Sequence, residues 1–142
     1  MKSIQEVYPQ CQEDDYFSYP SDYRPLLESF GYEILIQIDD HDYQGDSRLL
    51  YFDEGRYGIL VFGWGSCSGC DSLQACSSYE DIDELRDRLF HEIKWFDNAS
   101  DCLEYFEKHD WEGDFSWHDE EMKVFLEDGK ELIKKRIEEQ KS

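Results

Sequence analysis

Three short apolar segments between residues 32 and 64, separated by turn residues, constrain the fold more than any other feature of the chain. The first, YEILIQIDD, alternates with a period of two and places three isoleucines on one face: Ile34, Ile36 and Ile38. The segments SRLLYFD and ILVFGW follow, separated by HDYQGD and EGRYG, which contain turn residues. Connections this short join antiparallel strands, because parallel strands need long crossovers. The sequence therefore predicts a three-stranded antiparallel β-meander.

Helical periodicity dominates after the last of these strands. The segment SSYEDIDELRDRLFHEIKWF begins with Ser77-x-x-Glu80, a capping-box pattern, and then carries an apolar stripe from Ile82 to Phe96. A shorter helix is predicted around SDCLEYFEKH, and a last helix from about residue 119 to residue 139. We therefore predict three C-terminal helices packed on the sheet.

The remaining N-terminal part reads as an irregular segment followed by one short helix. RPLLESFG predicts a helical turn that starts near Pro25 and ends at Gly31. Together these segments predict a single α+β domain over residues 1–142. It comprises an irregular segment at 1–24, a short helix and the sheet at 25–64, and a Gly/Cys turn with the helices at 65–142.

Charge is the most extreme compositional property. The chain has 35 acidic side chains against 14 lysines and arginines, a net charge of −21. Such a surface repels nucleic-acid phosphates and anionic membranes and attracts basic proteins, although net charge also serves solubility. No apolar run approaches the length of a membrane span and no signal peptide is recognisable, so we expect a cytoplasmic protein with reduced thiols.

The segment GWGSCSGCDSLQAC holds three of the five cysteines. Cys67, Cys70 and Cys76 have the spacing C-x2-C-x5-C, which suits three ligands of a structural zinc ion. A fourth ligand would have to come from a distant residue, and the candidates are Cys11, Cys102, His91 and His118.

The same segment resembles, over about twelve residues, the active-site segment of thioredoxins: strand, Trp, Cys67-Ser-Gly-Cys70 and helix. Thioredoxin folds also need a proline facing the cysteines and further strands downstream. All three prolines of this chain lie upstream, and the sequence predicts no downstream strand. The leading interpretation is structural: glycines and serines form a tight turn and the thiols pack as small apolar groups. Zinc binding comes second and thiol redox chemistry third.

A second polar cluster, Asp39, Asp40, His41 and Asp42, ends the first predicted strand. Its oxygen atoms suit a divalent cation, but the EF-hand spacing is missing. A solvated turn is the favoured interpretation.

Acidic and aromatic residues alternate in the C-terminal half. Residues 97–121 contain ten acids and one lysine, with several aromatic residues between them, and a second acidic row follows the outer face of the first long helix. Carboxylates spaced along a helix can imitate duplex phosphates, and tryptophans serve as interface anchors. We predict a partner-binding surface made of Glu80, Asp83, Glu84, Asp87, Glu104, Glu107, Trp111, Glu112, Asp114 and Trp117.

The segments GRYGILVFGWGSCSGCDSLQAC, SYEDIDELRDRLFHEIKWF and SWHDEE resemble small acidic, functionally unassigned proteins of bacteriophages and prophages. This resemblance implies a phage accessory protein and brings no catalytic residues with it. We therefore expect a non-enzymatic inhibitor without a required cofactor. It would act as a DNA mimic on a basic, nucleic-acid-binding cleft of a host defence enzyme, such as a CRISPR effector or restriction nuclease. We expect no direct contact with nucleic acid or membrane, and the apolar third strand makes a homodimer plausible.

Overall fold

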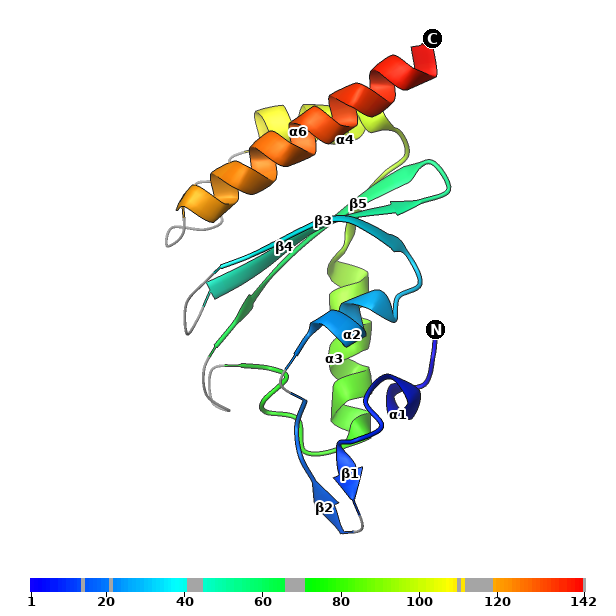
Figure 1. The fold of residues 1–142 in the computed structure, drawn as a ribbon, viewed down its shortest axis with the longest axis vertical. Helices are drawn as coiled ribbons and strands as arrows, with labels where there is room; N and C mark the ends of the chain where they lie inside the picture. The colour runs from blue at the N-terminus through cyan, green and yellow to red at the C-terminus, as the bar shows by residue number, and fades with distance from the viewer. Residues whose placement is uncertain are drawn as a thin grey trace.

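The structure is a computed structural model with mixed α+β architecture, and it is elongated, with the sheet near its middle (Figure 1). The residues that it describes are 1–13, 15–20, 22–40, 45–65, 71–109, 111 and 119–141.

The main sheet has four antiparallel strands in the order β3-β4-β5-β6. Strands β3 (Glu33–Asp39), β4 (Gly45–Asp53) and β5 (Arg56–Trp64) match the three strands predicted from the sequence. The predicted α+β architecture with an antiparallel sheet is therefore confirmed, but a sheet of three strands is not. The sheet has a fourth strand, because β6 (Lys94–Phe96) pairs with the free edge of β5.

Strand β6 corrects the predicted length of the first long helix. Helix α3 (Tyr79–Glu92) ends at Glu92, and Ile93 already has extended backbone angles. The apolar stripe continues to Phe96 in the sequence, but its last members belong to a strand. Side chains at Ile93 and Trp95 cover the glycine of β5 at position 58, and a Cβ atom there would lie 2.7 Å from Ile93 and 2.9 Å from Trp95.

Helices cover both faces of the sheet, with a separate apolar core on each side (Figure 1). On one face lie α1 (Ile4–Val7), α2 (Arg24–Glu28) and α3. On the other lie α4 (Ala99–Lys108) and α6 (Asp119–Lys141), which confirm the two C-terminal helices expected from periodicity. The three long helices thus do not share one layer.

The central strand β4 supplies both cores by simple alternation. Leu49 and Tyr51 pack on the α3 side, and Leu50 and Phe52 pack on the α6 side. Because both faces are covered, this strand is apolar on each side, as parallel-sheet strands usually are.

A bulge in β3 changes which of its side chains share a face. Ile34 pairs with Tyr51, but the next paired residue is Ile36, opposite Leu50, so Leu35 is the extra residue of the bulge. Ile34 therefore packs with the α3-side core, whereas Ile36 and Ile38 pack with the α6-side core. The prediction that the three isoleucines share one face was wrong for this reason.

The N-terminal segment, expected to be irregular, contains α1 and a two-stranded hairpin, β1 (Gln12–Glu13) with β2 (Tyr16–Phe17). This hairpin forms the lower end of the molecule in Figure 1. Tyr79, the first residue of α3, anchors it: the Tyr79 hydroxyl donates a 2.7 Å hydrogen bond to the carbonyl of Tyr8, and its ring meets Phe17 edge-on at 5.4 Å.

The predicted helical turn before the sheet is present as α2. It carries Pro25 in its first turn, and Gly31 follows it with a φ of +84°. A residue with a side chain rarely adopts that backbone conformation, which explains why glycine stands where the chain turns into β3.

Candidate protein-interaction surface

The first turn of α3 is fixed by reciprocal serine and aspartate hydrogen bonds. The Ser78 hydroxyl accepts from the backbone N–H of Asp81 (3.2 Å), and the Asp81 carboxylate accepts from the backbone and hydroxyl of Ser77 (2.9 Å each). These bonds, with the backbone bond first, lower the pKa of Asp81. The cap is therefore one residue later than the predicted Ser77-x-x-Glu80 box, which leaves Glu80 free of a capping role.

Four predicted partner-binding carboxylates lie on the outer face of α3. Ile82, Leu85 and Leu89 bury the inner face, and the exposed residues between them form what we call the α3 acidic row: Glu80, Asp83, Glu84 and Asp87. At 1.5 Å per residue the row extends about 10 Å along the helix, in steps of about 4.5, 1.5 and 4.5 Å, so the mean is one carboxylate per about 3.5 Å. One strand of duplex DNA carries a phosphate per ~3.4 Å of axis, so the axial charge densities are similar.

Two members of the row lie close to an arginine or histidine side chain on the same helix. Asp83 lies 3.1 Å from Arg86, and Asp87 lies 3.5 Å from the imidazole of His91. The Arg86 guanidinium is itself largely buried and also donates to the carbonyl of Lys2 at 2.6 Å, so it faces inward. Helix α3 contains six acids and two arginines, and its outer face therefore remains strongly negative.

The predicted residues of α4 form a separate, weaker surface. Glu104 and Glu107 are exposed, but Glu104 accepts a 2.7 Å hydrogen bond from Lys108. This bond lowers the pKa of Glu104 and raises the pKa of Lys108. Because α4 and α3 cover opposite faces of the sheet, their carboxylates do not belong to one helical face.

Trp111 was predicted to anchor a partner, but the structure buries it. Only 6% of the Trp111 surface is exposed, and its ring stacks on the Phe106 ring with 5.9 Å between the centroids. The Trp111 Nε1–H donates a 3.3 Å hydrogen bond to the backbone carbonyl of Phe106. Trp111 is thus part of the α6-side core, and its flanking acids misled the prediction. The predicted residues Glu112, Asp114 and Trp117, like His118, lie outside the described residues.

Sequence reasoning missed the aromatic side chains that are exposed. Tyr16 of β2 is 70% exposed and Tyr19 shortly after it is 49% exposed. A usable signal was present, because residues 3–23 contain five acids and no lysine, arginine or histidine around these tyrosines.

The three described cysteines are buried thiols. Burial raises the pKa of Cys76 to about 11 and that of Cys102 to about 12, and it also raises the pKa of Cys11. These three thiols are therefore protonated near neutral pH, which makes them poor nucleophiles. Cys67 and Cys70 lie outside the described residues.

The fold separates the candidates for a fourth zinc ligand. Cys102 belongs to the α6-side core, whereas Cys76 and Cys11 belong to the α3-side core. His91 lies in the last turn of α3, about 18 Å along the helix from its start, and hydrogen-bonds the carbonyl of Asp87. Of the described candidates, only Cys11 shares a core with Cys76. No group of three or more His, Cys, Asp and Glu within the described ranges is arranged to hold a metal ion.

Asp71, at the C-terminal side of the Gly/Ser/Cys segment, accepts hydrogen bonds from both sides of it. Its carboxylate is buried and accepts hydrogen bonds from the backbone N–H groups of Gly65, Leu73 and Gln74 and from the hydroxyl of Tyr23, at 2.8 to 3.0 Å. With four donors satisfied, this carboxylate joins Gly65 to residues 73 and 74 and to Tyr23, which is a structural role for Asp71 itself.

In the predicted cation-binding cluster at the end of β3, Asp40 has a structural role. Asp40 is buried and accepts a 2.8 Å hydrogen bond from Arg48, which is also fully buried. It also accepts from the backbone N–H of Asp46 at 2.7 Å, and so ties together the ends of the β3–β4 connection. His41 and Asp42 lie outside the described residues.

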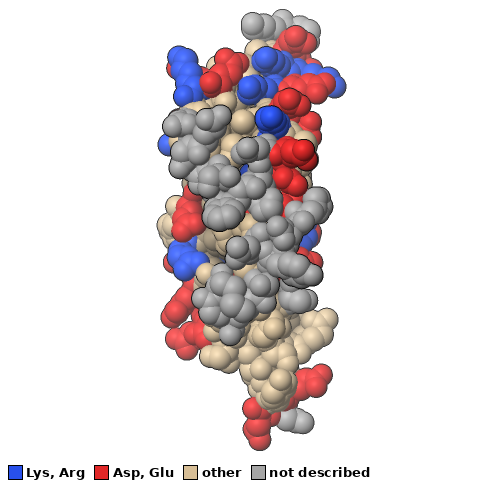
Figure 2. Space-filling view, turned by 90° about the vertical axis from the view of Figure 1, so that its left-hand side faces the viewer, with Lys and Arg blue, Asp and Glu red and all other residues tan. Residues whose placement is uncertain are grey.

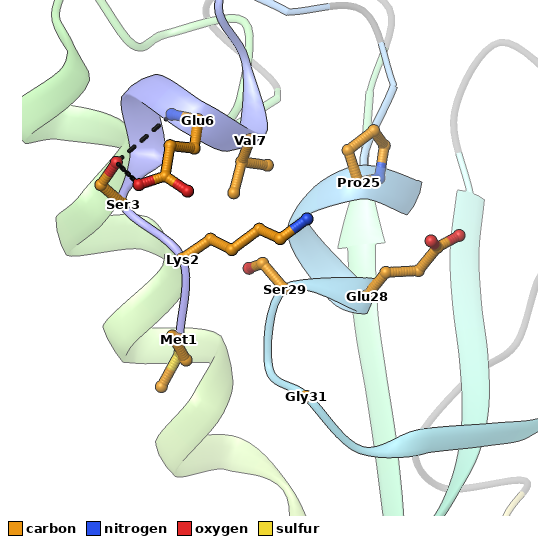
Figure 3. Close-up of a pocket in the computed structure, with 9 residues that line it drawn as sticks. All are labelled: Met1, Lys2, Ser3, Glu6, Val7, Pro25, Glu28, Ser29 and Gly31. Atoms are coloured by element: carbon orange, nitrogen blue, oxygen red, sulfur yellow. Dashed lines mark hydrogen bonds between the residues drawn. The ribbon is translucent and has the colours of Figure 1, made fainter.

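A hollow of about 710 Å³ lies between the N-terminal segment and α2. Figure 3 shows Lys2 extending across it from the chain before α1 toward α2, with the carboxylate of Glu28 directed away. On the α1 side the Ser3 hydroxyl donates to Glu6 at 3.2 Å. The charged groups that line this hollow do not converge on one point, as they would around a reacting substrate.

No helix within the described part of the chain is long and apolar enough to cross a membrane. Comparison with protein-family models, curated proteins and solved structures gave no significant match.

Proposed function

We propose that the protein is a non-enzymatic inhibitor of the phage type, which acts by acidic mimicry of DNA. It binds the basic, nucleic-acid-binding surface of a host defence enzyme, a CRISPR effector or a restriction nuclease. The observation that carries the proposal is the α3 acidic row, whose four exposed carboxylates have nearly the mean axial charge density of one DNA strand.

The α3 acidic row is the primary contact in this proposal. The buried face of α3 fixes the helix on the sheet, so the four carboxylates keep their spacing without a partner. A surface that is ordered beforehand loses little conformational entropy on binding. Glu104 and Glu107 contribute less, because Lys108 already compensates one of them.

Competition with DNA tests the proposal directly. A purified CRISPR effector or restriction nuclease is bound to a fluorescent duplex, and displacement by the protein is measured between about 50 and 300 mM salt. We expect the apparent affinity to fall steeply with salt, because the contacts are ionic and exposed.

A charge-matched pair of variants separates a directed surface from general acidity. The first variant neutralises the α3 acidic row (Glu80→Gln, Asp83→Asn, Glu84→Gln and Asp87→Asn). The second neutralises four exposed acids of α6: Glu127→Gln, Asp128→Asn, Glu131→Gln and Glu138→Gln. We expect the first to lose at least tenfold in affinity and the second to lose little. A salt-insensitive complex, or equal losses in the two variants, contradicts the mimicry mechanism.

A further inference from the structure

Exposed aromatic surface gathers on the β1–β2 hairpin. Among the described residues the exposed large apolar side chains are Met1, Tyr16, Tyr19 and Val124. Two of these four, Tyr16 and Tyr19, are three positions apart: Tyr16 belongs to β2 and Tyr19 follows that strand. Scattered exposed apolar residues need no explanation, but exposed tyrosines are enriched at protein interfaces.

The hairpin presents one of its faces outward. Phe17 turns toward α3, where its ring meets Tyr79, so the neighbouring Tyr16 points to the opposite side of the strand. Glu13 is the direct cross-strand partner of Tyr16, and directly opposed residues share a face. Tyr19, two residues beyond the end of β2, is exposed as well. We call the exposed residues Glu13, Tyr16 and Tyr19 the hairpin patch; only Glu13 and Tyr16 are placed on one face by the strand register.

The hairpin patch is held in place from behind. The backbone N–H of Gln12 donates to the Tyr79 hydroxyl at 3.3 Å, and that hydroxyl donates in turn to Tyr8. The contacts join both strands of the hairpin to the first turn of α3, so the patch has a fixed position relative to the α3 acidic row.

The charge around the hairpin patch is of one sign. Residues 3–23 carry Glu6, Glu13, Asp14, Asp15 and Asp22 and no basic side chain. In Figure 2 the lower end of the molecule shows uncharged surface bordered by acidic side chains, whereas basic side chains appear higher up. The chemistry that complements this patch is cationic.

Arginine complements the patch better than lysine does. A guanidinium group stacks flat on an aromatic ring and pairs with a carboxylate through two parallel hydrogen bonds, which an ammonium group cannot do. Both kinds of cation lie over rings elsewhere in the described part of the chain: Arg56 is 4.4 Å from the Trp95 ring, Arg136 is 4.8 Å from the Phe52 ring and Lys94 is 5.1 Å from the Tyr105 ring. The preference for arginine therefore rests on its flat shape and its paired hydrogen bonds, not on attraction to the ring alone. The rings of the hairpin patch have no such arginine among the described residues.

We propose that the hairpin patch docks onto arginine side chains of a basic protein partner and gives the acidic protein a preference for arginine-rich over lysine-rich surfaces. This inference rests on the proposed function for the class of partner, and it adds which cation is recognised and where.

Two peptides of equal charge test the inference. Fluorescently labelled deca-arginine and deca-lysine are titrated with the full chain, and binding is followed by anisotropy at low and moderate salt. We expect deca-arginine to bind several-fold more tightly, because each tyrosine–guanidinium contact at an exposed site contributes about two- to fivefold. In the double variant Tyr16→Ser/Tyr19→Ser, the affinity for deca-arginine should fall to the affinity for deca-lysine. The control Tyr16→Phe/Tyr19→Phe keeps the rings and should keep the preference.

The outcomes separate this inference from the proposed function. Equal binding of the two peptides by the native chain contradicts arginine recognition by the hairpin patch, and so does a preference for deca-arginine that survives the serine substitutions. Neither result contradicts DNA mimicry by the α3 acidic row. Neutralising the α3 acidic row should lower the affinities for both peptides to a similar degree and leave the ratio of the two affinities unchanged. A native chain that binds neither peptide at low salt contradicts both proposals.

Discussion

Gly129 lies in the middle of α6, where that helix packs against α4. A Cβ atom at this position would lie 2.6 Å from the ring of Phe106, which is itself buried. We expect Gly129→Ala to lower the free energy of unfolding, because overpacking of about 1–3 kcal/mol exceeds the ~1 kcal/mol that alanine contributes in a helix interior. Chemical denaturation measures the change. In a Phe106→Leu background the cost of Gly129→Ala should shrink, and a higher melting temperature for Gly129→Ala alone would contradict the close packing.

Single residues were the hardest features to predict from the sequence. The last predicted helix, from about residue 119 to residue 139, includes Gly129, but periodicity carries no sign that this glycine makes room for another helix. Trp111 looked exposed because acids flank it, yet its ring is buried against Phe106. Neighbours in sequence report local charge, whereas burial depends on contacts between distant segments.

The start of α3 can be tested at the level of the whole helix. Ser78→Ala removes the side chain that caps the helix, and we expect it to cost about 1 kcal/mol. Ser77→Ala removes only an exposed hydroxyl donor to Asp81 and should cost less than half as much. Thermal unfolding of the two variants side by side gives the comparison. Equal losses, or a larger loss for Ser77→Ala, would show that the cap begins one residue earlier.

Elements with a long regular pattern were predicted well, and short ones were not. The strands β3, β4 and β5 follow from apolar segments bounded by turn residues, and the helices α4 and α6 follow from helical periodicity. Strand β6 could not be predicted in this way, because its residues continue the apolar stripe of α3 and suit a helix as well as a strand. They form a strand because they pair with the free edge of β5. The β1–β2 hairpin has two residues per strand, and its contacts with Tyr79, 62 positions beyond Phe17, carry no local signal.

Alkaline pH tests the packing of the whole molecule. Burial raises the pKa of Cys76 to about 11 and that of Cys102 to about 12 from an ordinary value of 9.0, and it raises the pKa of Tyr8, Tyr23 and Tyr51 as well. Above pH 9 the unfolded chain loses thiol protons that the folded chain keeps. The free energy of unfolding should therefore fall as pH rises from about 9 to 11, by up to about 1.4 kcal/mol per pH unit for each such group.

Guanidinium denaturation at a series of pH values measures this fall, and Cys102→Ala is the matched control. Without the Cys102 thiol the decline should be shallower over the same range. A free energy of unfolding that is constant from pH 8 to pH 11 would show that the thiols are not buried as the structure has them.

The division of charge along the molecule has a consequence for the rate of association. The lower end carries the β1–β2 hairpin and the first turns of α3, whereas the upper end carries Lys134, Lys135 and Arg136 near the end of α6 (Figures 1 and 2). Residues 130–141 carry five basic and three acidic side chains, so this end of α6 is locally positive although the chain as a whole is strongly negative. A basic surface therefore repels this end of α6 and attracts the acidic lower end, which favours encounters that begin at the lower end.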